Sequence, residues 1–135
     1  MYLLDTNIIS EFRRAKPHGG VLAWIQDVPD SSLYISAVSI GEIQSGIEKT
    51  REQDRAKAKL LDAWLNEVMD GYAVLPMDAA AFRVWGQLMH RQSDTVIEDA
   101  MIAATALANH LTVVTRNIKD FKNGDTKGCI SQNQQ

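Results

Sequence analysis

The chain has 135 residues, enough for one domain with a substantial core but too few for two independent cores. Its 14 basic and 17 acidic residues give a net charge of −3, so the overall charge provides no attraction to nucleic acid. The single cysteine, Cys129, excludes an internal disulfide framework and a cysteine-based zinc site. No run approaches the roughly 18 apolar residues of a membrane span and the first residues do not resemble a signal peptide, so we expect a cytoplasmic protein.

The first half of the chain predicts alternating strands and helices. Short apolar runs bounded by turn residues predict strands at 2–4 and 33–35. Apolar residues at helical spacing predict helices over 8–14, 21–28 and 40–47. The first strand ends directly at Asp5, so we expect this carboxylate to face a crevice at the end of the strand.

The second half continues the alternation after a charged stretch, 48–59, which we interpret as solvated surface. We expect a long helix over 51–70 and helices over 79–89 and 99–108, and strands over 72–77 and 111–115. Asp78 is best explained as the cap of the second of these helices. Strands that alternate with helices predict an α/β domain with a mainly parallel sheet.

Several carboxylates are placed where they could share one site. Asp5 ends the first strand, Asn117 and Asp120 follow the last clear strand, and ligands of open parallel sheets bind at such ends. Asp99 and Glu42 lie near helix starts and can point into the same space. Two such charges 4 Å apart would repel by about 4 kcal/mol at an effective dielectric of 20, and a divalent cation removes this penalty. Carboxylate and water ligands favour Mg²⁺ or Mn²⁺ over Zn²⁺.

Each acid also has a structural explanation when it is considered alone. Glu42 follows Ser39 at the spacing of a capping box, which favours a role in helix capping. Asp99 could interact with a helix dipole, and Asp120 could close a turn. Asp5 is the hardest to explain structurally, because an acid directly after a buried strand is a poor choice unless something binds there.

Taken together, four segments resemble the motifs of PIN-domain nucleases, and most closely those of VapC-type toxins from bacterial type II toxin–antitoxin systems. The resemblance runs from about residue 1 to residue 122. The matching segments are Leu4-Asp5-Thr6-Asn7, Ser36-Ala37-Val38-Ser39-Ile40-Gly41-Glu42, Glu98-Asp99-Ala100 and Thr115-Arg116-Asn117-Ile118-Lys119-Asp120. It implies a PIN-like three-layer α/β sandwich in a nuclease domain over residues 1–125, with a polar tail over 126–135.

The resemblance also implies an activity and a site. The activity is endonucleolytic cleavage of RNA, often tRNA or rRNA, that depends on Mg²⁺ or Mn²⁺ and is neutralised by an antitoxin. The catalytic, metal-binding acids would be Asp5, Glu42, Asp99 and Asp120. The side chains that would orient these acids or bound water are those of Thr6, Asn7, Thr115 and Asn117. We expect phosphate contacts from a basic set that comprises Arg13, Arg14, Lys16, Arg116, Lys119 and Lys122.

The same family pattern implies a homodimer that reaches operator DNA only through its antitoxin. Two features depart from this pattern. Asn117 stands where an Asp would be a metal ligand, so the site is equally compatible with one metal ion and with two. The polar tail replaces the apolar residues of a last edge strand, so the sequence does not decide whether that strand forms. A first alternative is a non-catalytic subunit of a DNA-binding repressor complex. A second is a phosphatase with Asp5 as nucleophile, but such enzymes want a second Asp two residues on, where this chain has Asn7.

Overall fold

The computed structural model describes residues 1–12, 26–115 and 130–131. The strands in this part of the chain form one sheet in the order β3-β2-β1-β4-β5. Their bounds are Tyr2–Leu4 for β1, Leu33–Ser36 for β2, Ala73–Leu75 for β3, Thr112–Val114 for β4 and Ile130–Ser131 for β5. Strands β1 to β4 are parallel, and β5 pairs antiparallel with β4 at one edge. The predicted mainly parallel sheet is therefore confirmed.

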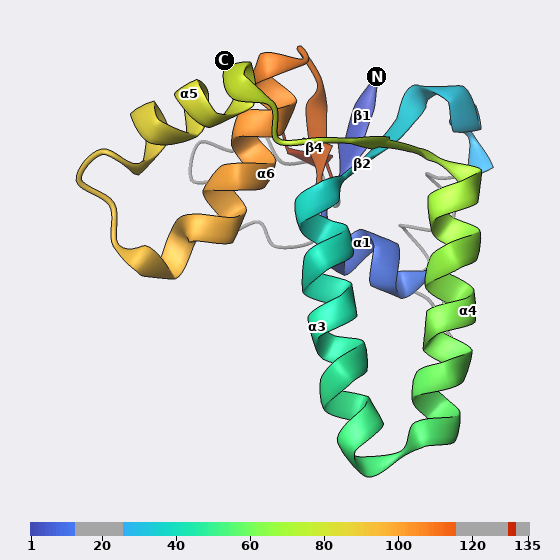
Figure 1. Cartoon of the computed structure of the whole chain (residues 1–135). Coiled ribbons are helices and arrows are strands. Elements are labelled where there is room, and N and C mark those ends of the chain that lie inside the picture. The colour runs from blue at the N-terminus through green and yellow to red at the C-terminus, as the bar shows by residue number, and fades with distance from the viewer. Residues whose placement is uncertain (13–25, 116–129, 132–135) are drawn as a thin grey trace.

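Helices cover both faces of the sheet. Their bounds are Thr6–Glu11 for α1, Ala37–Gln53 for α3, Arg55–Gly71 for α4, Ala79–Met89 for α5 and Ile97–Ala108 for α6. Helices α5 and α6 lie on one side of the sheet and α1, α3 and α4 on the other, with α3 and α4 forming a long hairpin that projects from it (Figure 1). The three-layer α/β sandwich is therefore the observed fold.

The strands are buried because successive side chains enter two different cores. Leu4 and Val114 pack with Ile8 and Ile9 of α1 on the face that α1 and α4 cover. Leu3, one residue earlier, packs with Ile102 of α6 on the other face. A sheet that is covered on both faces needs continuous apolar strands, which explains why these runs do not alternate with polar residues.

The turn of the long hairpin lies within the charged stretch 48–59. Helix α3 continues to Gln53, and a single residue, Asp54, separates it from α4. The Asp54 side chain accepts a hydrogen bond from the backbone N–H of Lys57 at 3.0 Å, so it caps α4. The long helix predicted over 51–70 is therefore interrupted near its start, because residues 51–53 belong to α3 and residues 55–70 to α4.

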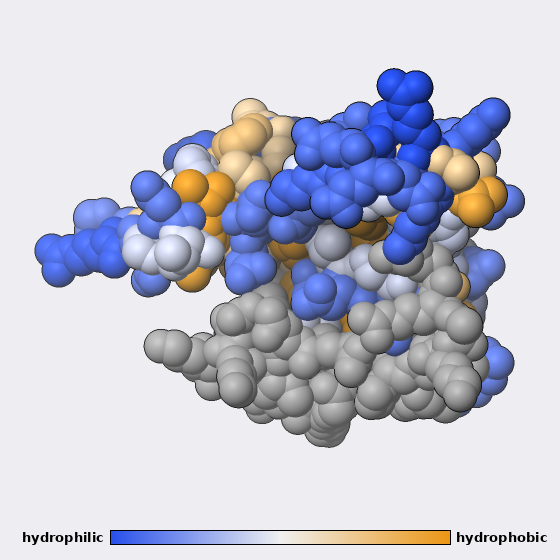
Figure 2. Space-filling model, turned by 90° about the horizontal axis from the view of Figure 1, so that it is seen from below, coloured by the Kyte–Doolittle hydropathy of each residue, from blue (hydrophilic) through white to orange (hydrophobic). Residues whose placement is uncertain are grey.

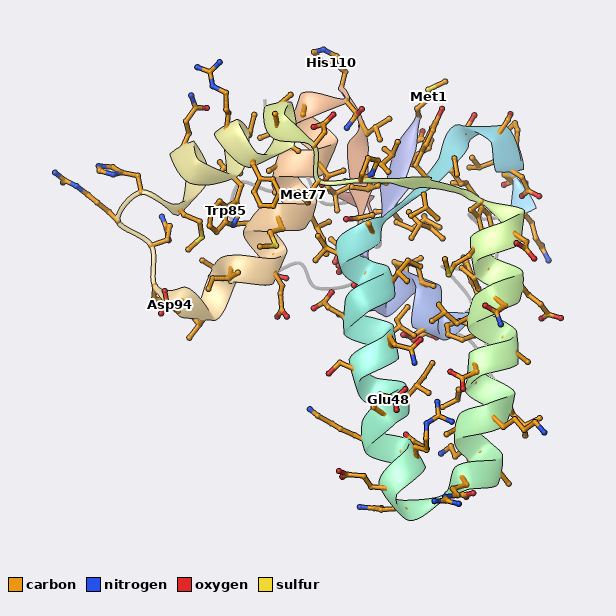
Figure 3. All side chains as sticks on the ribbon, in the orientation of Figure 1. Met1, Glu48, Met77, Trp85, Asp94 and His110 are labelled. Atoms are coloured by element: carbon orange, nitrogen blue, oxygen red, sulfur yellow. The ribbon has the colours of Figure 1, made fainter. Side chains whose placement is uncertain are left out.

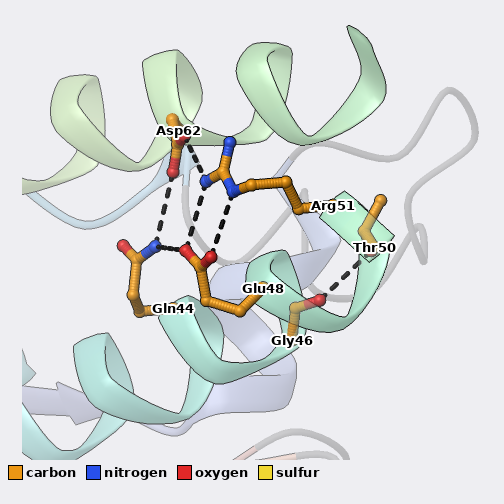
Figure 4. Close-up of polar contacts among 6 residues, drawn as sticks. All are labelled: Gln44, Gly46, Glu48, Thr50, Arg51 and Asp62. Atoms are coloured by element: carbon orange, nitrogen blue, oxygen red, sulfur yellow. Dashed lines mark hydrogen bonds and ion pairs between the residues drawn. The ribbon is translucent and has the colours of Figure 1, made fainter. Parts of the chain in front are cut away.

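Polar side chains that are partly or fully exposed join the two helices of the hairpin (Figure 4). Arg51 donates to Glu48 on its own helix at 3.0 Å and to Asp62 on α4 at 2.6 Å. Gln44 donates to Glu48 at 2.8 Å and to Asp62 at 3.4 Å. We call these four residues, Gln44, Glu48, Arg51 and Asp62, the hairpin network.

The remaining local predictions differ from the structure mainly at their ends. Asp78 caps α5 as expected and accepts from the backbone N–H of Ala81 at 2.9 Å. The helix predicted over 8–14 begins earlier, at Thr6, because Asp5 is its N-cap. The helix predicted over 21–28 falls largely outside the described residues, and the expected polar tail contains strand β5.

On the face seen from below, the coloured part of the molecule is largely hydrophilic, and hydrophobic side chains form only small patches there (Figure 2). Within the described ranges, no helix combines the length and the hydropathy that crossing a membrane would require.

Candidate active site

The carboxyl edge of the sheet collects buried polar residues. Register pairs Leu4 with Ile35 of β2 and with Val114 of β4, so the next residues of these strands lie at the same edge. Those residues are Asp5, Ser36 and Thr115, and all are buried. The chain leaves β1 toward β2 and returns beside β1 as β4, so Asp5 lies where the strand order reverses, which is where ligands of such sheets bind.

Both carboxylate oxygens of Asp5 accept hydrogen bonds. Oδ1 accepts from the backbone N–H of Thr6 at 2.8 Å, and Oδ2 accepts from the hydroxyl of Thr115 at 2.7 Å. The backbone N–H of Asp5 donates to the carbonyl of Val114 at 2.9 Å, which fixes the residue between two strands. Asp5 is only 7% exposed. The hydroxyl of Thr115 thus holds one oxygen of a buried carboxylate.

Thr6 connects Asp5 to a second acid on another helix. Its backbone N–H holds Asp5, and its hydroxyl donates to Oε1 of Glu42 at 2.6 Å. The same hydroxyl oxygen lies 2.7 Å from the hydroxyl oxygen of Ser39, one turn before Glu42 in α3. The hydroxyl groups of Thr6 and Ser39 therefore tie β1 and α1 to the start of α3.

The structure decides against the capping explanation for Glu42. The N-cap of α3 is Ser36, whose hydroxyl accepts from the backbone N–H of Val38 at 3.0 Å. Ser39 and Glu42 both lie inside the helix, so the capping-box interpretation of their spacing is wrong. Glu42 instead projects toward the carboxyl edge of the sheet, where its hydrogen bond to Thr6 holds it.

The electrostatic environment of Glu42 disfavours its ionised form. Burial raises the pKa of its carboxyl above the ordinary value, the hydrogen bond from Thr6 lowers it, and the charges of Glu98 and Asp5 raise it further. The net pKa shift is upward, with burial as its largest cause and the charges of acids on two other elements as smaller ones. Glu98 was not among the predicted site acids, although it directly precedes Asp99 in the matching segment.

The other predicted residues have mixed positions. Asp99 is half-buried in the first turn of α6, a helix whose N-cap, Val96, makes no side-chain capping bond. Asn7 is exposed in α1, and no hydrogen bond joins it to the acids among the described residues. The remaining predicted acid, amide and basic residues lie outside the described residues, and these are Asp120, Asn117, Arg13, Arg14, Lys16, Arg116, Lys119 and Lys122.

Within the described ranges, no three His, Cys, Asp or Glu side chains are arranged to hold one metal ion. Of the predicted acids, Asp5 and Glu42 are connected through Thr6. Met1 and His110 lie at the end of the strands opposite to Asp5 (Figure 3). The described part of the site is thus a pair of carboxylates near Glu98 in the first turn of α6.

A pocket of about 220 Å³ adjoins Glu42. Thr6 and Glu42 line one part of it, and Ile47 and Trp64 provide apolar walls from α3 and α4. The pocket therefore extends from Glu42 along the inner face of the hairpin.

An all-oxygen acidic site at the switch point of a three-layer α/β sandwich is typical of metal-dependent nucleases. The sequence matches the PIN domain family over residues 2–126. It is 36% identical over 133 residues to VapC ribonuclease Y4jK of Sinorhizobium fredii, which covers 90% of this chain and 91% of the relative. The chain therefore belongs to the PIN-domain family, and its relatives place it among the VapC-type toxins.

Solved structures agree with this assignment. The structure of FitAcB from Neisseria gonorrhoeae has a TM-score of 0.78 and 29% identity, covering 90% of this chain and 91% of that chain. The structure of FitAB bound to the IR36 DNA fragment has a TM-score of 0.76 and 28% identity, covering 90% and 89%.

Proposed function

We propose that this protein is a metal-dependent endoribonuclease toxin that cleaves RNA, with tRNA or rRNA as the substrate class, in the cytoplasm. The observation that carries the proposal is the pair Asp5 and Glu42, which Thr6 joins at the carboxyl edge of the sheet. Relatives that are named ribonucleases support the reaction class. The acids contributed by Asp99 and Asp120 complete the proposed site.

The described residues fit Mg²⁺ or Mn²⁺. The donors are carboxylate oxygens, which these ions prefer, and the described contacts of the two acids include neither imidazole nor thiolate. Magnesium in particular keeps several waters and is often held by only one or two carboxylates together with substrate phosphates. The absence of a three-ligand group among the described residues is therefore compatible with it.

The protein residues have separate tasks in this proposal. A bound divalent ion would activate a water and stabilise charge on the scissile phosphodiester. Asp5 would hold the ion directly, because Thr6 and Thr115 fix both of its oxygens and keep the carboxylate from rotating. Glu42 is fixed only through Oε1, which leaves Oε2 for the ion or for its water. The basic set around 13–16 and 116–122 would contact the RNA phosphates.

We further propose that the toxin is a homodimer and that a cognate antitoxin neutralises it. The antitoxin would lay an apolar helix or strand into the toxin and direct the complex to operator DNA, and the likeness to FitAB bound to DNA supports this arrangement. Phe82 on α5 remains 46% exposed and gives an apolar group for such contacts.

The test is cleavage of labelled tRNA and rRNA by the purified chain with Mg²⁺, with Mn²⁺ and with a chelator. We expect cleavage only with metal, and none by Asp5→Asn. Asp78→Asn is the matched control, because Asp5 and Asp78 are both helix N-caps and Asn caps a helix as well as Asp does. The two variants therefore differ in that only Asp5→Asn removes a charge from the proposed site.

Two results would contradict the proposal in different ways. Cleavage that survives the chelator and Asp5→Asn would rule out the metal site. Wild-type protein that cuts no RNA but binds operator DNA together with its partner would favour the non-catalytic subunit. A phosphoaspartate trapped on Asp5 would favour the phosphatase.

A further inference from the structure

A buried hydroxyl, Ser39, lies behind the hydrogen bond that holds Glu42. Its side chain is fully buried, and its oxygen is 2.7 Å from the hydroxyl oxygen of Thr6. Either oxygen could donate across this contact if the pair is considered alone. The surroundings of Thr6 remove this ambiguity.

A threonine hydroxyl carries one hydrogen, and Thr6 gives that hydrogen to Oε1 of Glu42 at 2.6 Å. The hydroxyl of Thr6 must then accept in its contact with Ser39, so Ser39 donates. The result is a directional chain in which Ser39 donates to Thr6 and Thr6 donates to Glu42. Hydrogen bonds aligned in this way polarise one another, which strengthens the last bond to the carboxylate.

The chain also restricts the geometry of Glu42. Ser39 and Glu42 are three residues apart on α3, so their side chains lie on the same face of the helix. Thr6 reaches them from α1, whose N-cap is Asp5. The bond from Ser39 limits rotation of the Thr6 hydroxyl, and the bond from Thr6 limits rotation of the Glu42 carboxylate.

We propose that Ser39 is a positioning residue for the metal site, acting on Glu42 only through the hydroxyl of Thr6. This inference rests on the proposed function, because it concerns the carboxylate that would bind the ion. It predicts a coupling between two hydroxyl groups, neither of which needs to touch the metal. A residue that merely fills space in the core would show no such coupling.

The experiment is a double-mutant cycle on Mn²⁺ affinity of the RNA-free protein, measured by electron paramagnetic resonance of the unbound ion. The variants are Ser39→Ala, Thr6→Val and the double variant. Loss of the direct donor in Thr6→Val should weaken Mn²⁺ binding by about 10- to 100-fold. Ser39→Ala in the wild-type background should weaken it by a smaller factor, on the order of 3- to 10-fold.

The decisive result is the effect of Ser39→Ala when Thr6 is already valine. We expect no further loss there, because the chain to Glu42 is already broken. Thr105→Val is the matched control, since its buried hydroxyl bonds to the carbonyl of Met101 and to the sulfur of Met77 rather than to the acids. This variant should leave Mn²⁺ affinity unchanged.

The outcomes separate the inference from the proposed function. Two results would overturn the inference alone, provided that the wild-type protein binds Mn²⁺. In the first, Ser39→Ala binds Mn²⁺ as tightly as wild type. In the second, Ser39→Ala lowers the Mn²⁺ affinity by the same factor whether residue 6 is threonine or valine. Wild-type protein that binds no Mn²⁺ would overturn the proposed function and the inference together. Misfolding is a minor concern for Ser39→Ala because alanine is the best helix former, and the unfolding transition of each variant checks it.

Discussion

The site and the hairpin network both place acids beside hydrogen-bond donors, but they balance the acids differently. In the hairpin network the guanidinium of Arg51 bridges Glu48 and Asp62, and hydrogen bonds from it lower the pKa of both carboxyls. In the site Glu42 is held by a neutral hydroxyl, and its pKa is raised. Both groups include residues of the same helix, α3, so the helix does not cause the difference.

The difference concerns the source of positive charge. The acids of the hairpin network have a cation from the protein itself and gain stability by being ionised. Glu42 is brought near Asp5 and Glu98, and among the described residues its hydrogen-bond partner is a neutral hydroxyl rather than a cation, which is unfavourable for the folded protein alone. Retaining an unfavourable arrangement is typical of a site that a cation completes.

The largest expected effect comes from neutralising an acid of the site, which is compared with neutralising an acid of the hairpin network. Glu42→Gln keeps an oxygen that can accept from Thr6 but removes the charge that would attract the metal. We expect single-turnover RNA cleavage to fall by more than about 100-fold, because changes to groups behind metal ligands already cost about 10- to 100-fold. Glu48→Gln, on the same helix, should leave cleavage unchanged. Equal losses in both variants would show that the two regions do not differ in function.

Removing the hydroxyl that orients Asp5 should have the next largest effect. Thr115→Val deletes the donor to Oδ2, so we expect Mn²⁺ affinity to fall by about 10- to 100-fold. The free energy of unfolding should fall by about 1–3 kcal/mol, because a buried carboxylate loses a partner. Calorimetric metal titration and urea unfolding measure the two effects. The control is Thr50→Val on the hairpin, because the hydroxyl of Thr50 donates to the carbonyl of Gly46 at 3.1 Å. Wild-type affinity in Thr115→Val would separate Thr115 from the metal site.

The site could be predicted where a residue follows a strand. Asp5 was recognisable because an apolar run ends at it, and parallel strands bring their carboxyl ends together. Thr115 was named only through the resemblance to PIN-domain nucleases. Glu42 was ambiguous because its spacing from Ser39 also fits a cap, and only the position of the helix start at Ser36 resolves this. Helix starts shift by one or two residues without changing the apolar pattern, so periodicity alone could not decide it.

Ser39 and Glu98 were missed as contributors to the site for a different reason. Their importance depends on contacts between elements far apart in the chain, and no local pattern encodes such contacts. The break between α3 and α4 at Asp54 was missed because no Gly or Pro in this charged stretch marks the end of a helix. The order of strands and helices, which follows from longer patterns, was predicted correctly.

A smaller effect should appear in the stability of the metal-free protein. The folded pKa of Glu42 lies above the ordinary value of 4.5, so its ionisation opposes folding. The contribution of the Glu42 carboxyl to the stability of the folded protein is full below pH 4.5, and it is lost as the pH rises through the folded pKa. At pH 7 in chelator, Glu42→Gln should therefore melt about 2 °C higher than wild type, and the difference should vanish near pH 4. A variant less stable at pH 7 would contradict the proposed repulsion.

The smallest effect is expected from the hairpin network, and its pH dependence should have the opposite sign. Arg51→Gln removes the cation that lowers the pKa of Glu48 and Asp62, so wild type should be more stable than the variant above the ordinary pKa values. That advantage should disappear on acidification as the two carboxyls become protonated. Because these side chains are exposed, the melting temperature should change by less than about 3 °C, and by less still at high salt. Cleavage should be unaffected, and a loss of cleavage in Arg51→Gln would mean that the two acid groups are coupled through α3 after all.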